Sequence, residues 1–236
     1  MSEAAGFAVG RLRHLSARLV PYDWAWAADN AAAIAANWSR RRTERPSLFD
    51  GRVLLACGHA SARDACEVAL FETDFSRFLA HRDAGDPDPS VANAFAAIVP
   101  HSADGAVILG RMGGHTANAG QIYFACGTPD PSDIRADGRV DLAGSAAREF
   151  SEETGIGLPQ DAAEGWVLLR GEGQLAFLRP VRFAEDAATL IDRMEAHRSS
   201  EAEPELAGFV VTRRPADIDP TRMPGFVRAY LAQAFG

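Results

Sequence analysis

Short apolar runs alternate along the chain with helical patterns, and together they predict a protein of the α/β class. Strands are expected where apolar runs stand between turn residues, at 51–58, 66–73, 93–101, 105–112, 120–127, 165–173, 174–183 and 206–214. Helices are expected at 23–46, 74–83, 186–200 and 225–236, where apolar residues recur at helical spacing. Pro46 marks the end of the first helix, and Asp74 is a candidate N-cap of the second.

A polar loop divides the chain into two predicted parts. The segment 83–90 reads DAGDPDPS, which combines turn residues with charge and contains no apolar run. We therefore predict an N-terminal α/β extension at 1–90 and a second domain at 91–236.

Composition narrows the classes of partner. The formal net charge of −8 argues against binding of a nucleic acid polymer through its phosphates, although a nucleotide needs only a local cationic pocket or a metal. The sequence contains no run of eighteen apolar residues and no secretory signal, so we expect no membrane span. The cysteines Cys57, Cys66 and Cys126 are odd in number and form no C-x-x-C pair, which favours a reducing cytoplasmic location.

A further helix is predicted just before Gly155. Asp141 can cap its start, and Gly155 followed by Ile156 fits a left-handed stop. Residues at four-residue spacing can face a core; these are Leu142, Ala146, Phe150 and Thr154.

The same helix gathers three carboxylates on one side, those of Glu149, Glu152 and Glu153. Like charges at this spacing destabilise an isolated helix by about 0.2–0.5 kcal/mol per pair, and Arg148 can offset only one of them. A divalent cation would relieve the repulsion, since hard cations prefer carboxylate oxygens. The alternative is a solvated acidic helix face, which surface helices often carry.

The string REFSEETGI, at 148–156, resembles the second half of the Nudix box, Gly-x5-Glu-x7-Arg-Glu-U-x-Glu-Glu-x-Gly-U, where U is a bulky apolar residue. Nudix hydrolases use Mg2+ or Mn2+ to cleave nucleoside diphosphates linked to another group. The resemblance implies that Glu149, Glu152 and Glu153 are metal ligands and that Arg148 orients them. It also implies a Nudix hydrolase domain at 91–236, folded as an α/β/α sandwich with a mixed sheet.

The first half of the box departs from the pattern. Counting back from Arg148, the first glutamate of the motif falls on Val140 and the glycine on Ile134, while Asp141 is one residue out of register. Gly127 resembles the motif glycine displaced by a longer loop, or else is an ordinary glycine at the end of a strand.

Two further loops are candidates for contact with a substrate. Some Nudix enzymes take another carboxylate from a loop outside the box, and here Glu203 or Glu205, which precede a strand, could serve. The glycine-rich segment 111–120 could act as a lid. Each loop has an ordinary alternative, a solvated acidic loop for the first and a hairpin loop for the second.

A weaker likeness reaches the N-terminal half. RPSLFDGRVLL, TDFSRFLAHRD and GAVILGR are similar in order and spacing to the Nudix branch that hydrolyses UDP-sugars. This resemblance implies a nucleotide-type substrate, converted to a nucleoside monophosphate and the phosphate of the second group. The N-terminal half could instead be a generic extension that packs on the domain or mediates a homodimer. Because Val140 replaces the first glutamate, a non-catalytic module that binds a nucleotide or a partner is the alternative function.

Overall fold

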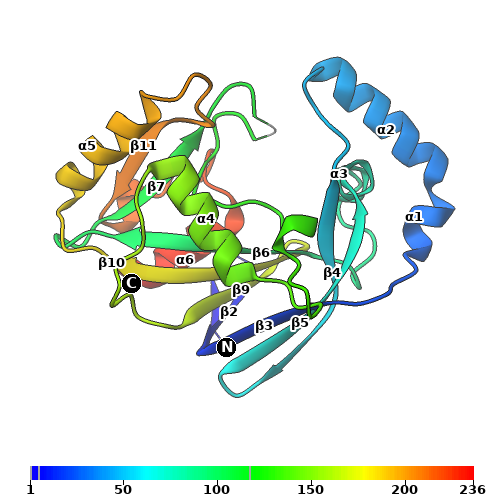
Figure 1. Cartoon of the computed structure of the whole chain (residues 1–236), viewed down its shortest axis with the longest axis horizontal. Coiled ribbons are helices and arrows are strands. Elements are labelled where there is room, and N and C mark those ends of the chain that lie inside the picture. Colours follow the sequence, from blue (N-terminus) through cyan, green and yellow to red (C-terminus); the bar gives the residue numbers. More distant parts are fainter. Residues whose placement is uncertain (1, 5, 117) are drawn as a thin grey trace.

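The computed structural model describes residues 2–4, 6–116 and 118–236. A larger sheet lies between helices, and a smaller sheet with its own helices stands beside it (Figure 1). The strands are β1 (Ser2–Ala4), β2 (Phe7–Leu12), β3 (His14–Leu19), β4 (Arg52–Ala62), β5 (Ala65–Asp74), β6 (Asn93–His101), β7 (Val107–Met112), β8 (Ile122–Tyr123), β9 (Trp166–Gly171), β10 (Gln174–Arg182) and β11 (Leu206–Thr212). The helices are α1 (Ala25–Asp29), α2 (Ala31–Glu44), α3 (Phe75–Asp83), η1 (Pro131–Asp133), α4 (Leu142–Thr154), α5 (Ala187–Arg198), η2 (Pro215–Asp217) and α6 (Gly225–Phe235).

The larger sheet is mixed. Its strand order is β1-β2-β9-β10-β6-β7-β11, with β8 paired to β7. Strands β10 and β6 run parallel, and the other pairs are antiparallel. A parallel pair requires a long crossover, and here the segment between β6 and β10 contains α4.

Both faces of this sheet are buried, which explains the nearly continuous apolar run of β6. Ile98 packs into a core shared with Phe150 of α4 and Leu190 of α5. The next residue, Val99, packs into a second core with Val227 of α6. Because successive strand residues point to opposite faces, α4 and α5 cover one face and α6 covers the other. The predicted α/β class and α/β/α layering are confirmed.

The smaller sheet, β3-β5-β4, also has two covered faces. Val53 and Phe71 pack against Trp24 and Ile34, which belong to the segment containing α1 and α2. Leu54 faces the core under α4, and its N–H donates to the carbonyl of Pro129 at 2.7 Å. The N-terminal half is therefore packed against the segment that leads from β8 to α4.

Several local predictions differ from the structure. The helix expected at 23–46 is divided into α1 and α2 at Asn30, whose side chain donates to the carbonyl of Trp26. The strand expected at 120–127 is reduced to the two residues of β8. Asp74 stands at the N-cap of α3 but makes no side-chain cap bond, because its carboxylate pairs with Arg52 and Arg77.

The first strands connect the two predicted parts. Strand β2 pairs with β9, so residues before position 90 supply part of the larger sheet. The division at 1–90 and 91–236 stays a prediction. Within the described residues, no helix is both long and apolar enough to cross a membrane.

Candidate functional site

Local sequence sets both ends of α4, as predicted. Asp141 Oδ1 accepts from the N–H of Gly144 at 2.9 Å, which caps the start of the helix. Gly155 has a φ of 68°, the left-handed conformation expected at a helix end. Leu142, Ala146 and Phe150 are buried under the helix, so its other side faces outward with the glutamates.

The three glutamates of α4 differ in exposure. The side chain of Glu152 is 63% exposed, and that of Glu149 is 22% exposed. Glu153 reaches furthest inward, and its Oε2 is buried without a hydrogen-bond partner among the described residues. An unpartnered buried carboxylate oxygen is costly, so it is the kind of atom that a bound cation would satisfy.

A fourth carboxylate joins this group from a distant part of the chain. Burial, followed by the charges of Glu205 and Glu149, raises the pKa of Glu153 to about 9. Burial also raises the pKa of Glu149, although Arg148 opposes that effect. Glu205 lies just before β11, and its carbonyl accepts from the N–H of Gly113 at 2.8 Å. The fold thus places the predicted Glu205 close enough to Glu153 to affect its ionisation.

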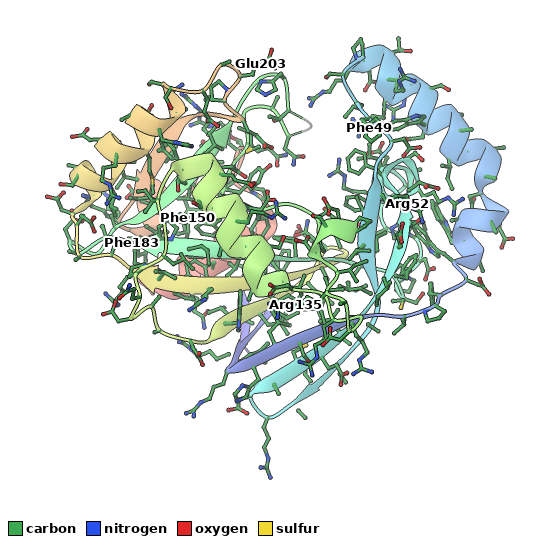
Figure 2. All side chains as sticks on the ribbon, viewed as in Figure 1. Phe49, Arg52, Arg135, Phe150, Phe183 and Glu203 are labelled. Atoms are coloured by element: carbon green, nitrogen blue, oxygen red, sulfur yellow. The ribbon has the colours of Figure 1, made fainter. Side chains whose placement is uncertain are left out.

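The two other loop candidates lie differently. A Cβ added to Gly127 would lie 3.1 Å from Oε2 of Glu149, so the glycine leaves room for that carboxylate. Glu203 is exposed, and Figure 2 shows it at the outer edge of the molecule, on the loop before β11. The structure therefore brings Gly127 and Glu205 to the helix and leaves Glu203 in solvent. The glycine-rich loop includes Ala117, which lies outside the described residues.

Arg148 holds the acidic groups together. Its Nη1 donates to Glu149 Oε1 at 2.7 Å and to Glu152 Oε2 at 3.4 Å. Its Nη2 donates to Asp133 Oδ1 at 3.0 Å and to Ser145 Oγ at 3.4 Å. One guanidinium therefore connects two glutamates of α4 to the preceding loop. The orienting role that the motif implies stays a prediction.

Asp133 is the residue that sequence reasoning missed. It is only 7% exposed, and its Oδ2 accepts from Ser145 Oγ and from the N–H of Asp130, both at 3.1 Å. The string DPSD at 130–133 is a signal for a capped turn, since Asp130 and Asp133 form a capping box around Pro131. That signal predicts the turn but does not predict which distant side chain Asp133 will meet.

Val140, at the position of the first glutamate of the motif, does not belong to the acidic group. Val140 is 5% exposed and packs in the core with Leu142, so the position of the missing glutamate is apolar and internal. Asp141, one residue later, caps α4 and pairs with Arg135. Asp133, seven residues before Val140, supplies the carboxylate that Arg148 contacts.

The donor set around α4 has the chemistry of a site for a hard cation. Carboxylate oxygens are the ligands preferred by Mg2+, and the Oε2 of Glu153 is buried without a partner among the described residues. Burial, and then neighbouring carboxylates, raise the pKa of Glu153, and burial raises that of Glu149 as well. In the part of the chain that the structure describes, however, no three His, Cys, Asp or Glu side chains lie close enough together to hold a metal ion. The residues therefore have the right chemistry for a hard cation, but their side chains do not have the spacing of metal ligands.

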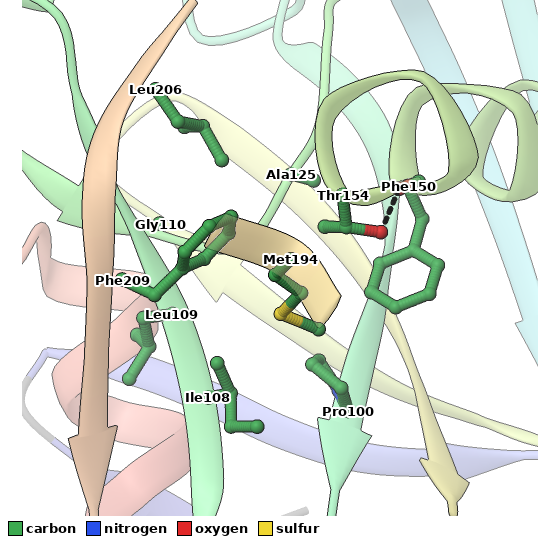
Figure 3. A pocket seen from close by; sticks show the side chains of 10 residues that line it. All are labelled: Pro100, Ile108, Leu109, Gly110, Ala125, Phe150, Thr154, Met194, Leu206 and Phe209. Carbon is green, nitrogen blue, oxygen red and sulfur yellow. Dashed lines mark hydrogen bonds between the residues drawn. The ribbon is translucent and has the colours of Figure 1, made fainter. Parts of the chain in front are cut away.

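A small void lies behind the helix and is not part of the site. Figure 3 shows it between α4, α5, β7 and β11, lined almost entirely by apolar side chains such as Ile108, Met194 and Phe209. Its volume is about 10 Å3, at the lower limit for a single water molecule. Such a gap reflects packing and offers no room for a substrate.

Comparisons with known proteins are distant. No protein-family model matches the chain, and no curated protein matches it. Among solved structures, a MutT protein from Methanosarcina mazei Go1 is 17% identical over 61% of this chain and 94% of its own, with a TM-score of 0.41. The pyrophosphohydrolase BsRppH of Bacillus subtilis is 11% identical over 59% of this chain and 76% of its own, with a TM-score of 0.33. These are partial likenesses, and what the chain does is therefore inferred from the side chains around α4.

Proposed function

We propose that this protein is a hydrolase of the Nudix type that cleaves the phosphoanhydride of a nucleoside diphosphate linked to a second group. The observation that carries the proposal is the buried carboxylate of Glu153, which lies beside Glu149 and Glu205 with an unpartnered oxygen. It stands in the string that resembles the Nudix box. A merely solvated acidic face would not bury one of its carboxylates.

The acidic residues divide into metal ligands and a proton acceptor in this proposal. Glu149, Glu152 and Glu153 would hold Mg2+ or Mn2+, which when bound supplies a polarised water and neutralises charge on phosphate oxygens. Arg148, fixed by Asp133, keeps Glu149 and Glu152 in place. Glu205 is the candidate proton acceptor, because it comes from outside the helix and stays exposed.

The preferred substrate is a UDP-sugar, converted to UMP and a sugar phosphate. Its support is the likeness of the N-terminal half to the UDP-sugar branch. The packing of that half is consistent with a part in substrate binding, since Leu54 of β4 bonds to Pro129, two residues beyond Gly127. A cytoplasmic location and a homodimer stay predictions.

The alternative function is a non-catalytic module that binds a nucleotide. It is favoured by the apolar Val140 at the position of the first glutamate and by the absence, within the described residues, of a formed group of metal ligands. The two functions differ in turnover and can both show nucleotide binding.

A substrate screen separates them. Purified protein is incubated with UDP-glucose, ADP-ribose, CoA and dinucleoside polyphosphates, with Mg2+, with Mn2+ or with a chelator, and the products are separated by chromatography. A hydrolase forms a nucleoside monophosphate only with the cation, and Glu149→Gln removes most of that activity. Glu44→Gln is the matched control, since Glu44 lies on α2 and is exposed.

Two results would contradict the proposal. If nothing is turned over but a nucleotide raises the melting temperature by mass action, the protein is the binding module. If Glu149→Gln and Glu44→Gln hydrolyse the same substrate at equal rates, the reaction occurs away from α4.

A further inference from the structure

A second group of polar side chains lines a cleft near one end of the larger sheet. The cleft has a volume of about 740 Å3, within the usual range for small-molecule sites. The polar residues that matter most in its lining are Arg11, His101, Arg182, Tyr230 and Gln233. They come from β2, β6, β10 and α6, so segments far apart in sequence meet there.

The arginine wall of this cleft lies on the face of the sheet opposite to α4. Leu12 and Val181 pack into the core under α4. Strand residues alternate in direction, so their neighbours Arg11 and Arg182 point to the other face, which α6 covers. The two arginines are therefore separated from the glutamates of α4 by the sheet, while Leu12 and Trp166, which also line the cleft, belong to the other face and place the cleft at the end of the strands.

A hydrogen-bonded pair lies near the arginines. His101 Nε2 and the Tyr230 hydroxyl lie 2.8 Å apart. Burial, and then the charge of Arg182, lowers the pKa of His101 to about 4, so the imidazole is neutral at pH 7. Whichever group donates the shared proton, the pair keeps one further N–H or O–H that can be donated to a ligand.

The two arginines lack the partners that most arginines of this protein have. Arg13, which also lines the cleft, pairs with Asp64 at 3.4 Å. Arg11 and Arg182 make no ion pair and no side-chain hydrogen bond among the residues that the structure describes. Both lie close enough to the hydroxyl of Tyr230 for their charges to lower its pKa, against the larger effect of burial, which raises it. Two unpaired guanidinium groups near one point favour an anion, and phosphate matches their geometry.

Acceptors lie on another wall of the same cleft. Asp161 and Glu164 belong to the loop before β9, which Arg179 holds by donating to the carbonyls of Ala162 and Ala163, each at 3.3 Å. Neither carboxylate forms an ion pair with a described residue. A ligand with hydroxyl groups at one end and a phosphate at the other would match both walls, since hydroxyls donate to carboxylates.

We propose that this cleft binds a hydroxylated phosphate monoester, such as a sugar phosphate, at a site separate from α4. The phosphate lies against Arg11 and Arg182 with the His101–Tyr230 pair, and the hydroxyls face the loop that carries Asp161 and Glu164. The assignment stands on the cleft alone and does not depend on the hydrolase proposal.

Calorimetric titration of the full chain tests the assignment. Glucose 6-phosphate, inorganic phosphate and glucose are titrated in the presence of a chelator, so that no cation at α4 can hold phosphate. Glucose 6-phosphate should bind more tightly than inorganic phosphate, and glucose should not bind measurably. Arg11→Ala and Arg182→Ala should each weaken binding about tenfold or more, the usual effect of losing a charge-assisted hydrogen bond.

Arg42→Ala is the matched control, because Arg42 is an exposed arginine of α2 and its loss changes the net charge equally. It should leave the affinity unchanged. The proposal is overturned if wild type releases no heat with either phosphate, or if Arg42→Ala weakens binding as much as Arg182→Ala does. Equal affinity for inorganic phosphate and glucose 6-phosphate would refute the role of the carboxylate wall. A single-stranded oligonucleotide is titrated as well, and tighter binding of it than of glucose 6-phosphate would overturn the assignment of the cleft to a small ligand.

Discussion

Each face of the larger sheet carries charged side chains without described partners, and the two sets of charges are opposite in sign. Beside α4, Glu153 has a buried oxygen without a partner and lies close to other carboxylates. On the α6 face, Arg11 and Arg182 face a cleft without a described ion-pair partner. Elsewhere opposite charges meet, as where Arg41 pairs with Asp83. The comparison teaches that a net charge says little about partners, whereas unpaired groups at one place indicate the sign of what binds there.

The largest expected effect is that of Glu153→Gln on the acidic face. Glutamine keeps the shape of the side chain but loses the charge that would hold a cation, so hydrolysis should fall by more than about 100-fold. Without a cation, the carboxyl has a pKa of about 9 and is mostly protonated at pH 7. The metal-free variant should therefore melt no lower than wild type. Rates and melting curves measured side by side check both statements, and a lower melting temperature with intact activity would contradict them.

Asp133→Asn should have the next largest effect. The change keeps the size of the side chain but removes the charge that Arg148 contacts at 3.0 Å. Because Arg148 orients Glu149 and Glu152, metal affinity or activity should fall by about 10–100-fold. Titration with Mn2+ gives the metal affinity directly. Asp137→Asn is a control, since Asp137 lies in the same connection but is exposed and pairs with Arg139. Equal affinities in the two variants would show that Asp133 has only a structural role.

The α6 face should show a pH dependence that the acidic face does not explain. Burial, and then Arg182, lowers the pKa of His101 to about 4, below the ordinary value near 6.5. Between pH 6.5 and 4 the unfolded chain therefore takes up a proton at this residue while the folded protein does not. This contribution to stability is full above about pH 6.5, falls as pH is lowered, and levels off below about pH 4.

His101→Gln removes that titration and tests it. Urea unfolding at pH 7 and pH 4.5 should show that wild type loses about 1–3 kcal/mol more stability than the variant over this interval. The carboxylates that titrate in the same range are common to both proteins, so the difference isolates His101. An identical loss in the two proteins would mean that the imidazole is not shielded by Tyr230 and α6.

The smallest effect is expected at Asp141, next to the apolar position of the box. Asp141→Ala removes the bond to the N–H of Gly144 and should lower stability by about 0.5–2 kcal/mol. Metal affinity should stay unchanged, because the carboxylate caps α4 and pairs with Arg135. A large fall in Mn2+ affinity with unchanged melting behaviour would show that Asp141 takes the place of the missing glutamate.

The sequence by itself determined the parts of the site that depend on short-range contacts. Both ends of α4 could be predicted, because a cap bond joins residues three apart and a glycine adopts a left-handed conformation without a penalty. The common side of Glu149, Glu152 and Glu153 follows from helical spacing alone. Their different exposures do not, because burial depends on what packs beside each side chain.

Only the tertiary structure decided which distant groups meet. Asp133 reaches Arg148 because a short turn folds back on α4, and Glu205 reaches Glu153 because β11 lies beside β7. The arginine wall of the cleft depended on strand order as well, since β2 and β10 become near neighbours only through their common partner β9. Strand order of this kind is set by the burial of two apolar faces at once, a property of the whole chain that no local pattern encodes.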